Sequence, residues 1–159
     1  MTALTSFRCV ALPADAFAPL FDLDDAQLRA RGVRRMTVDA HPGFPCRITL
    51  QDAQVGEAGL LLSHEHQPAD TPYRACGAVF VRERSRPREW AVNEVPEAIR
   101  RRLLSVRAYD AAGTMLGAEV AEGHALEAAV QRCFGDPQVA YLHLHNAGRG
   151  CYACRVDRA

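Results

Sequence analysis

The chain has 159 residues, of which 48% are hydrophobic and 24% are charged. These values are ordinary for one globular domain, and they exclude a disordered chain. Basic and acidic residues balance at nineteen each, which argues against a nucleic-acid-binding protein. We therefore expect a single domain over residues 1–159, large enough to bury a core without help from disulfides or a metal.

Every basic side chain is arginine, which together with the many alanines suggests a GC-rich bacterial genome. The arginines at 82–88 alternate with acidic and turn residues, a pattern typical of a solvated loop. Residues 1–8 contain no basic leader or apolar run, and the apolar stretch 59–62 is too short to cross a bilayer. We expect a cytoplasmic protein with no membrane partner, whose six cysteines are reduced.

The first half of the chain predicts short strands and helical turns. Asp24 is a good helix N-cap and Gly32 a good stop for the helix between them. In chain order we expect strand 7–12, helical segments 15–21 and 24–31, strands 34–39, 47–50, 60–66 and 78–83, and helical turns at 96–102.

The second half shows clearer periodicity. Strands 104–109 and 115–122 flank the turn 110–113, and apolar residues from Leu126 to Phe134 repeat at helical spacing. A last hairpin joins 139–145 to 151–156 through the loop 146–150. Because these connections are too short for parallel crossovers, the sequence predicts an α+β fold: an antiparallel or mixed sheet with two to four short helices.

The last hairpin separates apolar from polar side chains, because alternate residues of a strand face opposite sides. With a five-residue loop, His145 would pair with Cys151, His143 with Ala153, and Tyr141 with Arg155. The expected core face is Leu142, Leu144, Tyr152, Cys154 and Val156. The expected polar, half-exposed face is Tyr141, His143, His145, Cys151 and Arg155.

This register suggests a nucleophile at Cys151. Directly opposed residues have β-carbons roughly 5 Å apart, so His145 would act as the base for the Cys151 thiol and Asn146 would orient it. The alternative is an ordinary half-buried cysteine beside a turn. Cys151 and Cys154 form a C-x-x-C pattern, but residues three apart on a strand face opposite ways, so redox chemistry is not expected. We expect no disulfide, with Cys133 and Cys154 buried and inert.

Two His-x-His patterns raise the question of metal. His64 with His66, and His143 with His145, could each present two imidazoles to zinc, and Glu65 could orient a ligand or act as a base. Neither pair has a third and fourth ligand nearby in sequence, so no stoichiometric metal and no cofactor are expected. Zinc remains an alternative, as do histidines held by hydrogen bonds alone.

Arginine and tyrosine side chains near these patterns favour an anionic ligand, because guanidinium groups fork onto carboxylate or phosphate. The candidate ligand-binding residues are Cys46, Arg47, His66, Tyr73, Arg74, Arg107, Tyr109, His143, Asn146 and Arg155.

Several short motifs follow one another along the chain, at residues 42–47, 66–68, 72–74, 77, 80–81, 107–110, 143–146 and 150–153. In this order they resemble a bacterial family known only as domain of unknown function 1203. The resemblance implies no activity, cofactor or substrate. At Ala78 the family often has proline, and Cys154 is not part of its pattern.

Three functions remain in competition. The first is a domain that binds or transforms a small anionic molecule at a polar His/Cys/Arg site. The second is a non-enzymatic, homodimeric interaction module, and the third is a zinc-binding protein. The chain has no Gly-rich phosphate loop, G-x-S-x-G or H-E-x-x-H motif, so the sequence leaves open whether the protein is an enzyme.

Overall fold

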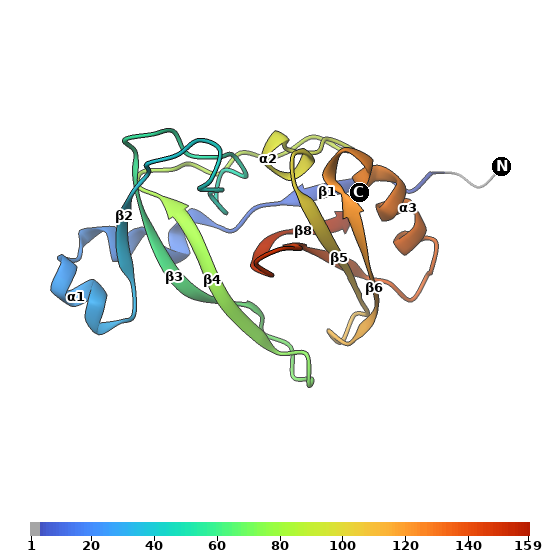
Figure 1. The fold of residues 1–159 in the computed structure, drawn as a ribbon. Coiled ribbons are helices and arrows are strands. Elements are labelled where there is room, and N and C mark those ends of the chain that lie inside the picture. Colours follow the sequence, from blue (N-terminus) through green and yellow to red (C-terminus); the bar gives the residue numbers. More distant parts are fainter. Residues whose placement is uncertain (1–3) are drawn as a thin grey trace.

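The computed structural model describes residues 4–159, whose strands form two antiparallel sheets (Figure 1). Residues 1–3, part of the segment where no signal peptide is expected, lie outside the described residues. The five-stranded sheet has the order β1 (Phe7–Val10), β8 (Tyr152–Arg158), β7 (Tyr141–Asn146), β5 (Leu103–Tyr109) and β6 (Met115–Glu122). The three-stranded sheet has the order β2 (Arg34–Thr37), β3 (Ala58–Gln67) and β4 (Ala75–Arg82).

Helices are few and short in the described part of the chain. They are α1 (Asp25–Ala30), α2 (Glu97–Arg100) and α3 (Leu126–Phe134), with 3-10 turns at Ala14–Ala16, Ala18–Asp22 and Gly123–Ala125. The expected antiparallel pairing and short helices are confirmed. The α+β class is corrected to a mostly β fold, because two sheets make up most of the regular structure. None of the described helices combines the length and apolar character needed to span a membrane.

Local sequence signals explain most of the elements. Asp24 caps α1, and its carboxylate and the Gln27 side chain form a reciprocal capping box. The strand expected at 47–50 is wrong. Its residues form a turn in which the Leu50 N–H donates to the Cys46 carbonyl at 2.9 Å, and Leu50 has a φ of 53°. A left-handed residue closes the turn and ends any extended run.

The five-stranded sheet is covered on both faces. One face packs against α2 and α3 in a core that includes Ile99, Leu126 and Leu142. The opposite face meets the three-stranded sheet, where Tyr152 of β8 packs into a second core with Leu60 and Phe80. The polar face is therefore enclosed at its histidines, which were expected to be half-exposed: His143 and His145 are only 2% and 1% exposed, whereas Cys151 and Arg155 are partly exposed.

The last hairpin confirms the predicted faces except at Tyr152, and it corrects the register. Leu142 pairs with Val156 and His143 with Arg155, two residues beyond the expected partners. A shift of two keeps every side chain on its face, so Leu142, Leu144 and Val156 lie in the core opposite His143, as predicted.

A β-bulge then changes the pairing near the turn. The register shifts between Leu144 and His145, so that Leu144 pairs with Cys154 but His145 pairs with Tyr152. The one extra residue, Ala153, moves Tyr152 to the histidine face. Tyr152 was expected on the core face with Leu142, and this placement is wrong.

The cysteines are all free thiols, as expected. Cys154 is buried, and a hydrogen bond with Cys9 together with burial raises its pKa well above the ordinary value, so its thiol stays protonated. Cys133 is half-buried rather than buried, which corrects that expectation.

The contact between β3 and β4 predicts a steric effect at Gly59. A β-carbon there would overlap the Phe80 ring and lie 2.6 Å from the Val81 carbonyl oxygen. We expect Gly59→Ala to lower the free energy of unfolding by about 1–3 kcal/mol, as overpacking does. Gly117→Ala on β6 is the control, because nothing lies within 4 Å of the position that its new methyl group would take. Equal urea midpoints for the two variants would contradict the prediction.

Candidate metal centre

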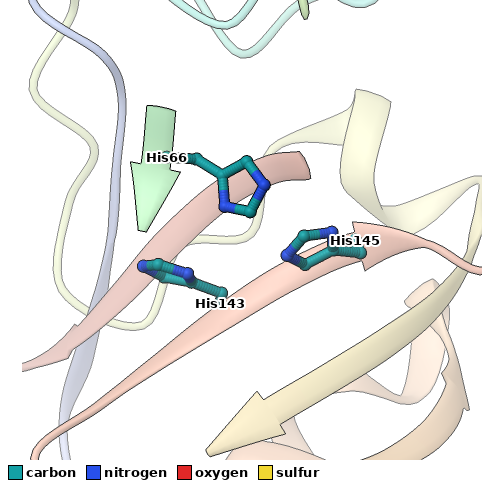
Figure 2. A group of neighbouring side chains, drawn as sticks. All are labelled: His66, His143 and His145. Carbon is teal, nitrogen blue, oxygen red and sulfur yellow. The ribbon is translucent and has the colours of Figure 1, made fainter. Parts of the chain in front are cut away.

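Three histidines meet between the sheets (Figure 2). His143 and His145 come from β7, where strand alternation places them on one face, and His66 comes from β3 of the other sheet. One ring nitrogen from each residue lies within 4.8 Å of those of the other two. The ring centroid of His66 is 5.0 Å from that of His145 and 6.1 Å from that of His143.

Each ring carries a buried nitrogen that has no hydrogen-bond partner among residues 4–159. These atoms are His66 Nδ1, His143 Nδ1 and His145 Nε2. Buried polar atoms normally find a partner, so three such atoms in one cluster make it a candidate ligand site.

The tautomer of His145 is fixed by the backbone. Its Nδ1 lies 2.9 Å from the Gly150 carbonyl oxygen, which can only accept a hydrogen bond. In the neutral ring Nδ1 therefore carries the hydrogen, and Nε2 keeps its lone pair. Histidines that bind metals are commonly oriented in this way by a second hydrogen bond.

Burial keeps the cluster neutral. Burial lowers the pKa of His143 to about 3 and that of His145 to about 4, with the charges of neighbouring groups adding to the effect for His143. The pKa of His66 is also lowered, chiefly by burial and then by His64 and Arg107. Neutral imidazoles have the lone pairs that metal ions require.

Aromatic rings enclose the histidines. Tyr152 stacks on His66 with centroids 5.1 Å apart, while Tyr109 and Tyr141 lie 5.0 and 5.2 Å from His143. Tyr141 is held in place by a 2.9 Å hydrogen bond from the Gln67 amide. The three tyrosine rings cover one side of the imidazoles and limit the access of water there.

A cavity of about 670 Å³ adjoins the cluster. Its walls include His64, His66, Tyr141, His143, Tyr152 and Arg155. A small molecule in this cavity would reach two of the three histidines. His64, which sequence analysis grouped with the zinc ligands, is instead packed 5.5 Å from the Phe17 ring and is not a member of the cluster.

The predicted arginines differ in their surroundings. Arg107 is the cross-strand partner of His143, and its Nε donates to Ser105 Oγ at 3.2 Å. Arg155 lies over the Tyr141 ring and donates to Asp157 at 2.6 Å.

The predicted ligand residues of the β3–β4 loop lie outside the cluster. Arg74 forms a two-pronged, exposed ion pair with Glu65, at 3.0 and 3.1 Å. Glu65, which the sequence suggested as an orienting group or base, is engaged in this ion pair. Tyr73 is 40% exposed.

The pairing of Cys151 with His145 is wrong. The bulge places Tyr152 opposite His145, and the Cys151 thiol instead accepts from the Asn146 amide at 3.3 Å and contacts the Arg47 guanidinium. These three residues line a separate cavity of about 980 Å³. The cross-strand pairing that suggested His145 as the base for this thiol is therefore absent.

Arg47 and Cys46 have structural partners. Arg47 is buried and donates to the carbonyls of Tyr152, at 2.7 Å, and Pro45, which ties the 42–47 turn to β8. The buried Cys46 thiol accepts from the Arg82 N–H at 3.3 Å. The expected ligand residues thus do not form one site: some lie at the histidine cluster, Arg47 and Asn146 line the Cys151 cavity, and Tyr73 and Arg74 belong to neither.

Sequence reasoning found the histidines but not their grouping. The two His-x-His patterns were the signal, yet only the packing of β3 over β7 selects His66 and leaves His64 out. Tyr152 and Gln67 were missed as site residues.

Two antiparallel sheets around three histidines, two of them buried and His66 half-buried, define the class: a mostly β protein with a candidate three-histidine metal centre. Residues 43–158, which include all three histidines, match the model of the family described as Protein of unknown function (DUF1203), and the chain belongs to that family. Neither the curated proteins nor the solved structures provide a match.

The lowered pKa values predict how stability depends on pH. In metal-free protein, unfolded histidine takes up a proton below about pH 6.5, whereas folded His145 and His143 do so only near 4 and 3. The free energy of unfolding should therefore fall as the pH drops from 6.5 towards 4.

Urea unfolding in the presence of a chelator would measure how the free energy of unfolding changes with pH. His143→Gln should make this change smaller, and His124→Gln, at an exposed histidine, should not. Identical slopes for the wild type and His143→Gln would contradict the prediction.

Proposed function

We propose that the protein binds one divalent transition-metal ion, zinc in the first instance, through His66, His143 and His145. The observation that carries this proposal is the set of three buried imidazole nitrogens without partners. Zinc accepts neutral imidazole at about 2.0–2.1 Å, and three protein ligands leave a fourth position for water or a small molecule.

The surroundings fit such a centre. The rings are neutral near pH 7 because burial lowers their pKa values. The Gly150 carbonyl orients His145, and the tyrosine rings restrict water. A bound metal would supply Lewis acidity to whatever occupies the fourth position.

This proposal joins two functions that the sequence left in competition, zinc binding and a site for a small anionic molecule. The cavity that opens beside His66 and His143 would let such a molecule reach the cluster. If the protein binds no metal, a homodimeric interaction module becomes the better explanation of its function.

We also propose a bacterial, cytoplasmic location. The arginine- and alanine-rich composition and the free state of the six cysteines support it.

Metal titration tests the centre directly. Chelator-treated protein should bind one Zn²⁺ or Co²⁺ per chain, and each of His66→Ala, His143→Ala and His145→Ala should weaken binding by more than about 100-fold, since loss of even an outer partner costs 10- to 100-fold. Calorimetry and the visible spectrum of Co²⁺ would measure both stoichiometry and affinity.

His64→Ala is the matched control. This residue lies two positions from His66 on β3 but outside the cluster, so its loss should leave metal affinity within about threefold of the wild type. Absence of binding, or equal weakening by His64→Ala and His66→Ala, would contradict the proposed centre.

A further inference from the structure

We infer that the small-molecule ligand of this centre is an oxyanion, a carboxylate or a phosphate, that bridges the metal and the guanidinium of Arg107. This inference rests on the proposed function, because it names the class of molecule that the metal would hold.

Arg107 lies next to the cluster by strand pairing. It is directly opposite His143, and Ser105, two residues earlier on β5, is directly opposite His145. Opposed residues have β-carbons roughly 5 Å apart on the same face of the sheet. The Arg107 side chain therefore shares the inter-sheet space with the histidines. Its charge also contributes to the lowered pKa of all three.

Arg107 lacks an acidic partner. Within residues 4–159 it forms no ion pair, and its hydrogen bonds go to the neutral hydroxyls of Ser105 and Tyr109. It is half-buried, and charges removed from water need compensation. Neutral histidines provide none.

The other arginines near the centre are already engaged. Arg155 donates to Asp157 at 2.6 Å and stacks on Tyr141. Arg47 donates to two backbone carbonyls. Arg107 is therefore the cation best able to accept an anionic ligand, and its planar fork matches the two oxygens of a carboxylate or phosphate.

A metal ion raises the need for an anion. Three neutral imidazoles leave the metal with its full double positive charge beside the Arg107 cation, and the two repel. An oxyanion with one oxygen on the metal and another on the guanidinium would offset this repulsion. Metal and anion should therefore bind cooperatively, and each should strengthen the other by the same factor.

The experiment measures Co²⁺ affinity in a non-coordinating buffer, alone and with acetate or inorganic phosphate. For the wild type we expect the preferred anion to raise Co²⁺ affinity roughly tenfold, within the usual range of such coupling. Comparing acetate with phosphate shows which class of anion the site recognises, a carboxylate or a phosphate.

Arg107→Gln should change two quantities in opposite directions. Without anion, Co²⁺ should bind more tightly than to the wild type, because the repulsion is gone. With anion, the enhancement should disappear. Arg132→Gln, which removes an exposed arginine paired with Glu119 on β6, should behave like the wild type.

Arg107→Lys provides a second variant should the glutamine weaken folding. It keeps the charge but loses the fork, so Co²⁺ affinity without anion should match the wild type while the enhancement shrinks. Enhancement that persists undiminished in either variant, or that is absent from the wild type, overturns the inference and leaves the metal centre standing. Failure of Co²⁺ to bind at all overturns the proposed function.

Discussion

The meeting of three imidazoles between two β-sheets is the constraint on which the rest of the structure depends. His143 and His145 are almost fully enclosed, and their unbonded nitrogens face that of His66 from the opposite sheet. Polar atoms in such a place are costly unless something binds them. The protein reduces this cost by keeping the rings neutral, and a metal ion would remove it. The same feature thus links the packing of the sheets to the proposed chemistry.

The contacts around the cluster show how the two sheets are held in place. Tyr152, turned inward by the β-bulge, stacks on His66 and packs into the core of the three-stranded sheet. Arg47 donates to the carbonyl of the same residue from the turn at 42–47. A single position on β8 therefore connects both sheets and the turn. Without the bulge, Tyr152 would face α3 and the histidines would lose one wall.

The two cavities differ in the partners of their arginines. Around the histidines, Arg107 is without an acidic partner among the described residues, while Arg155 is paired with Asp157. Around Cys151, Arg47 donates to two carbonyls and lies against the thiol. The histidine side has lone pairs for a cation and a guanidinium for an anion. This combination is what a metal centre with a small acidic ligand requires.

The sequence by itself determined the local features. Alternation in 141–156 determined which side chains face the core, with the exception of Tyr152 at the bulge, because a register error of two residues preserves the faces. Capping by Asp24 and the turn at Asp110 were equally local. Only the tertiary structure decided the site. One bulge residue separated His145 from Cys151, and the packing of β3 over β7 joined His66, rather than His64, to the pair. The contacts of His66 join residues more than seventy positions apart, and no local pattern encodes which sheet faces will meet.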